Sequence, residues 1–360
     1  MSRSPFATAR AAVRPIDLAG AGAAADERTN QLTKPPGSLG RLESLGTQLA
    51  AIARTCPPPV PEPVRVCVFA GDHGVLARGV SPWPQEVTAQ MVANFCTGGA
   101  AVNVLARHAG AEVTVVDVGV ATPIPAGSAA LLRRNVRHGT ADLSTGPAMT
   151  ADEALAALDV GAEVAADAVA DGARLLVTGE MGIGNTTPAA ALIAACTGSS
   201  AEVVTGRGTG IDDATLTVKV DVVRRAVARL GPDASPLDVL TEVGGLEIAA
   251  LAGFIVGGAA AGMPVLLDGV IAASAALVAC AFVPDAAGYL IAGHRSSEPG
   301  ASVALRHLGL EPVLDLDLRL GEGSGAALAI PVVQAAAKIL REMATFEQAT
   351  IAAGHAPRPA

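Results

Sequence analysis

From Val64 onward, short segments rich in Val, Leu and Ile alternate with longer alanine-rich segments, and this alternation is the strongest constraint on the fold. Strands that alternate with helices imply crossover connections and a mostly parallel sheet covered by helices on both faces. The predicted fold class is therefore α/β, with a doubly wound, Rossmann-like sheet. Strands are predicted at 64–74, 112–120, 174–180, 264–269, 286–293 and 312–317, and helices at 84–108, 151–171, 187–196, 214–230, 244–260, 271–281 and 299–308.

Helical patterns flank this core at both ends of the chain. Residues 17–55 predict helices interrupted at Pro35-Pro36, and the segment "CPPPVPEP" at 56–63 predicts a linker. The last 35 or so residues are again typical of a helix. We predict an α/β domain at 64–322 and a small helical domain in which 1–55 packs together with 323–360.

Composition narrows the class of protein. Hydrophobic residues make up 51% of the 360 residues but aromatic residues only 2%, so the core must consist of Ala, Val, Leu and Ile. The net charge of −9 argues against a nucleic-acid partner, which requires a basic face, but leaves an anionic small substrate open. The five cysteines include no CxxC pair, which favours buried free thiols in a reducing cytoplasm. The N-terminus lacks the apolar core of a signal peptide.

One segment raises the alternative of a membrane protein. Residues 248–267 are uncharged and as long as a spanning helix. The segment is broken by Gly262-Met263-Pro264, and acidic residues flank it with no nearby Lys or Arg. We therefore predict a buried helix followed by a buried strand, and no stable membrane insertion.

The loop "TGEMGIGNTT" at 178–187 joins a predicted strand to a predicted helix. Unpaired N–H groups and the positive end of a helix dipole suit an anion such as a phosphate. Gly182 and Gly184 would let the backbone approach a ligand, and Asn185 can cap the helix. The loop has no Walker lysine and contains an acid, Glu180. A plain strand-to-helix turn is the alternative interpretation.

A second glycine-rich segment, "TGRGTGIDD" at 205–213, repeats the pattern. Gly208, Thr209 and Gly210 can donate hydrogen bonds to phosphate oxygens, and Lys219 supplies the positive charge that the first loop lacks. The alternative is a helix cap by one of the two aspartates that follow, which is compatible with a ligand nearby.

Polar residues also follow the later strands. Asp268 lies in "LDG", Ser296 in "GHRSSEPG" and Glu322 in "LRLGEGSG". Parallel strands point their carboxyl ends at one crevice, so these loops should converge, and Asp268 and Ser296 are candidate substrate-binding residues. Glu322 lies between glycines before the last helix, and in an apolar crevice its pKa would rise toward that of a useful general base. A solvent-exposed turn residue is the alternative for Glu322.

Two further features have both a functional and a structural interpretation. Asp72 and His73 resemble a catalytic or metal pair, but no further histidine lies at ligand spacing, so we predict no metal site. Trp83, the only tryptophan, lies between two prolines, with Ser81 before it and Met91 after it. A rigid aromatic and apolar lip suits a flat heteroaromatic ligand, whereas core packing is the structural alternative.

Eight segments between about residue 15 and residue 345 carry a family resemblance. In chain order they are "TKPPGSLGRLE", "AGDHGV", "GVSPWPQEVTAQMV", "TGEMGIGNTT", "GRGTGIDD", "EVGGLEIAALAGFI", "HRSSEPG" and "LRLGEGSGAAL". Together they resemble the nicotinate-nucleotide–dimethylbenzimidazole phosphoribosyltransferase family of cobalamin biosynthesis. The resemblance implies an α/β large domain, a helical small domain, a homodimer, and no metal or other cofactor.

The resemblance also implies a reaction and its residues. The family transfers the phosphoribosyl group of nicotinate mononucleotide to 5,6-dimethylbenzimidazole, giving α-ribazole 5′-phosphate and nicotinate. Glu322 would remove the benzimidazole proton, and Glu180 would face C1′, where positive charge develops. The 5′-phosphate would lie against Gly182, residues 208–210, Lys219 and Ser296, and the acceptor near Ser81, Trp83, Met91, Leu320 and Glu322.

Two alternatives remain open at the level of the sequence. One is a transferase for another azole or purine acceptor, because an apolar pocket discriminates a methyl group by only about 1–3 kcal/mol. The other is a non-catalytic carrier that binds benzimidazoles without turnover. A base candidate together with two phosphate loops favours the enzyme, since a carrier needs neither.

Overall fold

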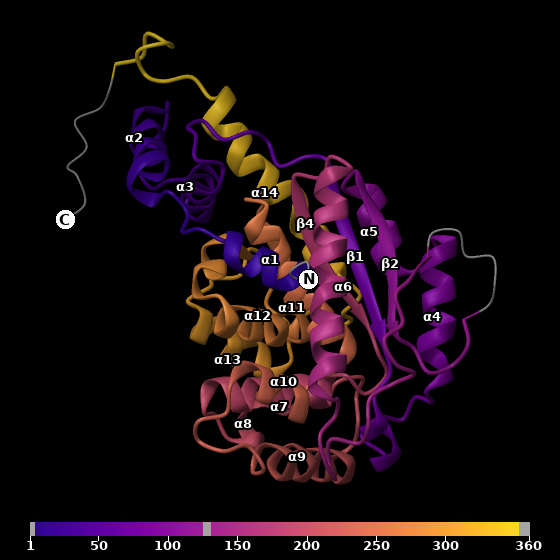
Figure 1. The fold of residues 1–360 in the computed structure, drawn as a ribbon. Helices are drawn as coiled ribbons and strands as arrows, with labels where there is room; N and C mark the ends of the chain where they lie inside the picture. Colours follow the sequence, from indigo (N-terminus) through magenta and orange to yellow (C-terminus); the bar gives the residue numbers. More distant parts are fainter. Residues whose placement is uncertain (1–3, 125–130, 353–360) are drawn as a thin grey trace.

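A six-stranded, all-parallel sheet forms the centre of the molecule in the computed structural model, which describes residues 4–124 and 131–352 (Figure 1). The strand order is β3-β2-β1-β4-β5-β6, with Val64 of β1 paired with Ala111 of β2 on one side and Leu175 of β4 on the other. The strands are β1 (Val64–Gly71), β2 (Ala111–Gly119), β3 (Leu131–Arg133), β4 (Leu175–Met181), β5 (Val265–Leu267) and β6 (Leu290–Ala292). The predicted α/β fold class is confirmed.

Helices connect the strands, and several begin at side-chain caps that the sequence encodes. Thr150 and Glu153 form a capping box at the start of α6, and Asp212 accepts the Thr215 N–H at the start of α9. The helices are α1 (Pro5–Ala12), α2 (Ala23–Gln31), α3 (Arg41–Ala53), α4 (Glu86–Thr97), α5 (Ala101–His108), α6 (Ala151–Ala170), α7 (Thr186–Thr197), α8 (Ala201–Val204), α9 (Asp213–Val227), α10 (Pro236–Val243), α11 (Leu246–Ala260), α12 (Val270–Phe282), α13 (Pro299–Leu308) and α14 (Ser324–Glu342).

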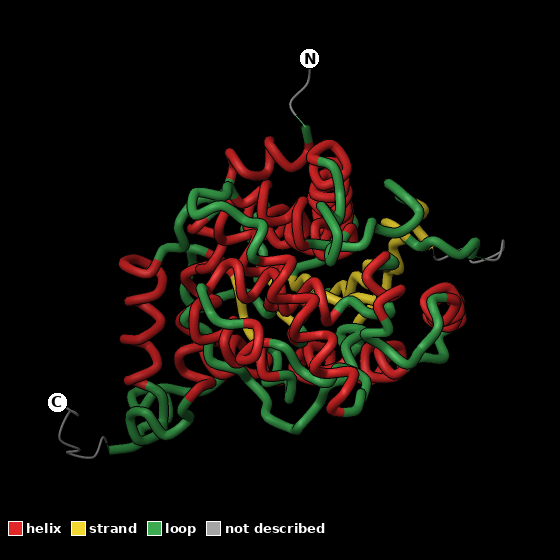
Figure 2. Tube along the Cα trace, turned by 90° about the horizontal axis from the view of Figure 1, so that it is seen from below, coloured by secondary structure: helices red, strands yellow, loops and turns green. Residues whose placement is uncertain are grey.

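Both faces of the sheet are covered, as a parallel sheet requires (Figure 2). Successive side chains of a strand point to opposite faces. In β1, Cys67 and Phe69 pack in the cluster that contains α6, α7, α11 and α12, whereas Val66 and Val68 pack in the cluster that contains α3, α4, α5 and α14. The loops after the strands therefore emerge between two helical layers.

The packing of the helices on the α6 and α11 face of the sheet depends on small residues. Helix α11 is almost entirely buried and packs against α6. A Cβ at Gly161 of α6 would collide with the carbonyl oxygen of Ala250, and one at Gly253 of α11 with that of Leu158. The two helices approach so closely that backbone meets backbone, which fits a core with few aromatic residues. Residues 248–260 thus form the predicted buried helix, and β5 is the buried strand that follows.

The two ends of the chain meet beyond the sheet. Ala25 of α2, Ala50 of α3 and Leu340 of α14 form a small buried cluster, and residues Leu32 and Thr345 form an isolated bridge (Figure 1). In contrast, α1 packs against α6 and α11 beside the sheet. The division into domains at 1–55, 56–63, 64–322 and 323–360 stays a prediction, and parts of both terminal ranges lie outside the described residues.

Some elements of the structure differ from the prediction. The predicted helix 84–108 is two helices, because Gly98 adopts a left-handed φ of 80° and ends α4. The strand predicted at 312–317 is wrong, since that segment contributes only a bridge between His294 and Leu314. Strand β3 is absent from the predicted strands, because pairing with β2 rather than a local apolar pattern defines it.

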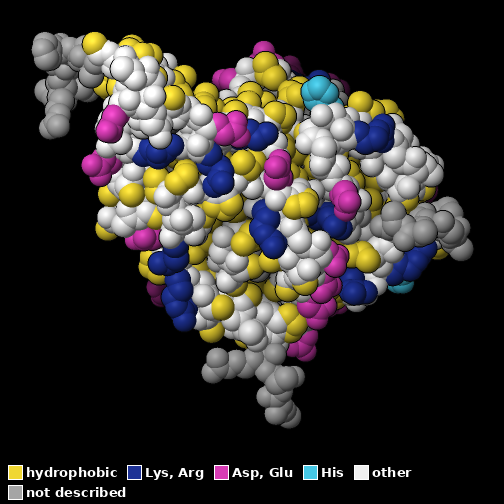
Figure 3. Space-filling view, turned by 90° about the horizontal axis from the view of Figure 1, so that it is seen from above, with side chains coloured by type: hydrophobic (Ala, Val, Ile, Leu, Met, Phe, Trp, Pro, Cys, Tyr) yellow, Lys and Arg dark blue, Asp and Glu magenta, His cyan; other side chains and the backbone are white. Residues whose placement is uncertain are grey.

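Three properties of the described residues bear on the classes of protein considered above. None of the helices within 4–124 and 131–352 is both long and apolar enough to cross a bilayer. On the face shown in Figure 3, Lys and Arg side chains are interspersed with Asp and Glu side chains. All five cysteines are free thiols.

We predict that the α6–α11 contact is a major source of stability. Gly161→Ala should lower the free energy of unfolding by about 3 kcal/mol, because backbone on α11 blocks the added methyl group. Gly231→Ala is the control, since a Cβ there meets nothing within 4 Å. Urea denaturation measures both variants. Equal stabilities would show that the two helices can separate without cost.

Candidate active site

A cavity of about 650 Å³ opens at the carboxyl ends of β4, β5 and β6. The glycine-rich loops and the loops after the later strands converge there, as the parallel topology predicts. Of the fifteen residues proposed for the site, only Gly210 and Asp268 do not line the cavity. Those that line it are Ser81, Trp83, Met91, Glu180, Gly182, Gly184, Asn185, Gly208, Thr209, Lys219, Ser296, Leu320 and Glu322.

Glu180 lies at the end of β4 and is buried. Its Oε2 accepts a hydrogen bond from the amide of Asn185, and its Oε1 accepts the backbone N–H of Glu322 at 3.3 Å. Burial, followed by the charge of Asp268, raises the pKa of Glu180 to about 8. In the unliganded protein at neutral pH Glu180 is therefore mostly protonated, and an uncharged acid does not repel an anion.

Glu322 lies in a turn with unusual backbone geometry. Its φ is 67°, between Gly321 at 84° and Gly323 at 98°, so three consecutive residues are left-handed. Left-handed backbone is uncommon for a residue with a side chain and often marks a functional site. The Glu322 side chain is buried, and its Oε2 accepts the N–H of Val102, at the start of α5, at 3.4 Å.

The electrostatics of Glu322 suit a general base. Burial raises the pKa of Glu322, the Val102 N–H opposes this rise, and the Asp268 charge adds to it. A carboxylate whose pKa lies closer to neutrality takes up a proton more readily. The involvement of α5 was not visible in the sequence, because Val102 contributes a backbone group that carries no signature.

Lys219 supplies positive charge at another part of the cavity wall. This almost fully buried side chain donates hydrogen bonds to the hydroxyl of Thr186 at 2.8 Å and to the carbonyl of Gly206 at 3.0 Å. Burial lowers the pKa of Lys219 to about 8, although the Glu298 charge opposes the shift. The ammonium group has three N–H donors, so one remains for a bound anion.

The second glycine-rich loop is partly occupied by protein groups. Gly208 donates its N–H to Glu298 at 2.8 Å, and the N–H of Gly210 donates to the carbonyl of Arg207. A role for these two N–H groups in phosphate binding thus requires those partners to move, and it stays a prediction. Glu298 lines the cavity, and nothing in its sequence context signalled the bond to Gly208.

An apolar lip borders the cavity near Glu322. Trp83 is 51% exposed and Leu320 is 58% exposed, and Met91 lines the same cavity. Trp83 is therefore not a core residue. The backbone N–H of Trp83 donates to the hydroxyl of Ser81 at 3.3 Å. Exposed apolar side chains around a concave site are suited to a flat aromatic ligand.

Asp72 and His73 lie outside this cavity lining. The Nε2 of His73 lies 2.8 Å from Glu247 on α11, with both side chains completely buried. Burial lowers the pKa of His73, but the charge and hydrogen bond of Glu247 and the charge of Asp72 together outweigh this effect and raise the pKa above its usual value. Among the residues that the structure describes, no group of three or more His, Cys, Asp and Glu side chains is arranged to hold a metal ion.

Comparisons with known proteins identify the family of the chain. A family model described as phosphoribosyltransferase matches residues 14–351. Two curated relatives are named nicotinate-nucleotide–dimethylbenzimidazole phosphoribosyltransferase. The one from Salinispora tropica is 58% identical and covers 95% of this chain and 98% of its own length, and the one from Chloroflexus aggregans is 53% identical and covers 92% and 94%.

A solved structure gives the same result. The crystal structure of CobT from Thermus thermophilus matches with a TM-score of 0.90 and 51% identity over 93% of this chain and 99% of that chain. The fold and the family model define the class, a phosphoribosyltransferase that transfers a pentosyl group. Within that class the chain belongs to the nicotinate-nucleotide–dimethylbenzimidazole phosphoribosyltransferase family, as the resemblance implied.

We predict a pH-dependent stability effect at Glu180. An unfolded chain ionises this group near the usual 4.5, whereas the folded pKa is about 8, so raising the pH from 5 to 8 favours unfolding. Glu180→Gln cannot ionise and should gain stability relative to wild type over this range, on the order of 3 kcal/mol. Urea unfolding at several pH values measures this. Parallel stability curves would mean that folded Glu180 is ionised throughout.

Proposed function

We propose that this chain transfers the phosphoribosyl group of nicotinate mononucleotide to 5,6-dimethylbenzimidazole, giving α-ribazole 5′-phosphate and nicotinate for the lower ligand of cobalamin. The observation that carries the proposal is Glu322, a buried carboxylate in a left-handed turn beside an apolar lip. The names of the relatives supply the two substrates.

The nucleotide would bind along the strand ends. We assign its 5′-phosphate to Lys219, the Gly182–Gly184 backbone and Ser296, which line the cavity together. The buried ammonium of Lys219 would act as a point charge, and glycines would let the backbone approach the phosphate oxygens. Thr209 lines the same wall and is a further candidate donor.

The acceptor would bind at the lip formed by Trp83, Met91 and Leu320, with Ser81 at its edge. One ring nitrogen of dimethylbenzimidazole attacks C1′ of the ribose, and the bond from C1′ to the pyridinium nitrogen breaks. Glu322 accepts the proton from the other ring nitrogen. Nicotinate leaves with the bonding electron pair, and attack from the opposite face converts a β-linked nucleotide into an α-linked one.

Glu180 would assist as positive charge develops at C1′. Burial and the charge of Asp268 raise the pKa of Glu180. The positive charge of a bound pyridinium would lower this pKa and favour the ionised carboxylate. Asn185 donates to Glu180 and would keep its carboxylate directed at the ribose. A preorganised carboxylate stabilises an oxocarbenium-like transition state more than the ground state.

The proposal extends to the setting of the enzyme. We propose a homodimer in the cytoplasm, with small-molecule substrates, no nucleic-acid partner, and no metal or other cofactor. The net charge of −9 and the free thiols support this setting. Another azole or purine acceptor is the second candidate, because the lip is largely apolar and discriminates small substituents weakly.

We predict that Glu322→Gln abolishes most of the turnover. Loss of a general base should lower kcat by about 10²- to 10⁴-fold with the fold intact. Chromatography of nicotinate and α-ribazole 5′-phosphate, after incubation with both substrates, measures this. Glu163→Gln, an exposed change on α6, is the matched control and should retain wild-type turnover. Product formation at the wild-type rate by Glu322→Gln would contradict the assignment, and no product from wild type would favour another acceptor or a carrier.

A further inference from the structure

The turn that carries Glu322 needs an external support. Left-handed backbone at a non-glycine residue costs free energy and persists only where surrounding contacts hold it. The turn also ends at the start of α14, where a helix leaves its first N–H groups without partners inside the helix. The structure supplies the missing partners from another element.

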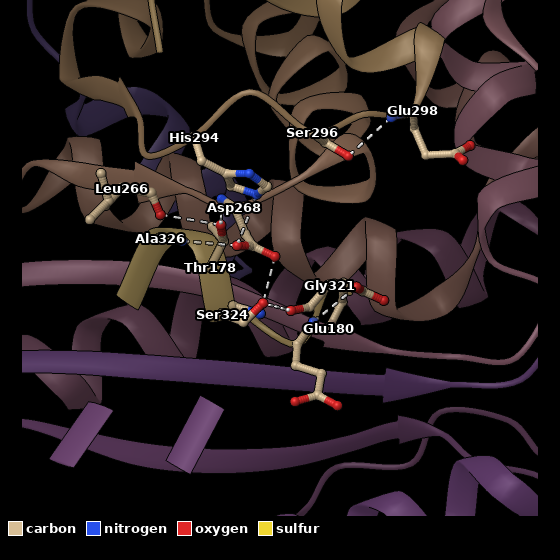
Figure 4. A network of polar contacts seen from close by, with 12 residues as sticks. Thr178, Glu180, Leu266, Asp268, His294, Ser296, Glu298, Gly321, Ser324 and Ala326 are labelled. Carbon is tan, nitrogen blue, oxygen red and sulfur yellow. Dashed lines mark hydrogen bonds and ion pairs between the residues drawn. The ribbon is translucent and has the colours of Figure 1, made fainter. Parts of the chain in front are cut away.

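Asp268, which directly follows β5, provides them (Figure 4). Its Oδ2 accepts the N–H of Gly323 at 3.2 Å, and its Oδ1 accepts the N–H of Ala326 at 2.9 Å. The side chain is buried and caps α14 from a strand 55 residues earlier in the sequence. A carboxylate in this position also complements the positive end of the helix dipole.

Asp268 is itself fixed from two sides. The hydroxyl of Thr178 accepts the Asp268 N–H at 3.0 Å and donates to the carbonyl of Leu266 at 3.2 Å, which joins β4 to β5 (Figure 4). The Nε2 of His294 lies 3.4 Å from Asp268 Oδ1. The ring of His294 packs against Gly325, where a Cβ would collide with it. Both carboxylate oxygens are therefore engaged inside the protein.

We propose that Asp268, supported by Thr178 and His294, is a positioning residue that fixes the Gly321–Glu322–Gly323 turn and thereby places the Glu322 carboxylate for proton removal. This assignment rests on the proposed role of Glu322. It replaces the substrate contact that the sequence suggested for Asp268, because this side chain does not line the cavity.

Charge gives the proposal a second, measurable consequence. The groups around Glu322 are the carboxyl of Glu180 on β4, the carboxylate of Asp268 after β5, with His294 beyond it, and the Val102 N–H on α5. Asp268 adds to the rise in the pKa of Glu322. Removing this charge should move the acid limb of the pH profile of kcat/KM to lower pH, since that limb reports the base of the free enzyme.

The test is Asp268→Asn in the full-length enzyme. We expect kcat to fall about 10- to 100-fold while KM for nicotinate mononucleotide changes little, because a misplaced base affects the chemical step. The acid limb should move to lower pH. Backbone amide hydrogen exchange of residues 321–326 should become faster, and this readout does not depend on turnover.

Asp117→Asn is the matched control. Asp117 is also a buried aspartate near the end of a strand that does not line the cavity. Its Oδ1 accepts the N–H of Val120 at 2.9 Å and the side-chain amide of Asn135, so its hydrogen bonds do not reach the turn at 321–323. This variant should leave kcat, the acid limb and exchange at 321–326 near their wild-type values. Thr178→Val keeps the Asp268 charge and is the second variant if Asp268→Asn does not fold. We expect it to speed exchange at 321–326 and to lower kcat several-fold.

The outcomes separate this proposal from the proposed function. A higher KM with unchanged kcat, acid limb and exchange in Asp268→Asn would overturn the positioning role and favour a direct substrate contact. Unchanged exchange and kcat in Thr178→Val would also overturn it. Absence of product from the wild-type enzyme would contradict the proposed function, whereas faster exchange at 321–326 in Asp268→Asn would still show that Asp268 holds the turn.

Discussion

The geometry of the site depends on how the start of α14 is fixed to the carboxyl edge of the sheet. The carboxylate of Asp268 accepts the N–H groups of Gly323 and Ala326, which a helix start leaves unpaired. These bonds hold Glu322 in a backbone conformation that most side chains avoid. Glu180, at the end of β4, accepts the N–H of the same residue. Two neighbouring strands thus determine where the Glu322 carboxyl lies, and the helical layers position those strands.

The same edge accommodates a buried glutamate and a buried lysine because burial raises the pKa of Glu180 and lowers the pKa of Lys219. Glu180 has a pKa of about 8 and is largely uncharged near neutrality, whereas Lys219, also with a pKa of about 8, is still mostly charged at pH 7. The unliganded cavity can therefore attract a phosphate. A bound pyridinium would then favour ionisation of Glu180, so that negative charge appears where the transition state needs it.

Much of this fold could be predicted from the sequence, because alternating apolar and alanine-rich segments are local signals that survive in any arrangement of the chain. The break at Gly98 and the three-residue strand β3 could not, since one depends on a single backbone angle and the other on pairing with β2. The site loops were predictable because glycine-rich turns after parallel strands meet at one edge. Contacts such as Val102 with Glu322, 220 residues apart, were not, because they involve backbone groups brought together only by folding.

The most direct test of this account is a crystal structure of Glu322→Gln with nicotinate mononucleotide and dimethylbenzimidazole bound. We predict that a phosphate oxygen lies within hydrogen-bonding distance, about 3 Å, of Lys219 Nζ. The acceptor should lie between Trp83 and Leu320, with one ring nitrogen adjacent to residue 322 and the other facing C1′. A phosphate bound away from Lys219, or an acceptor whose nitrogen does not reach residue 322, would contradict the account.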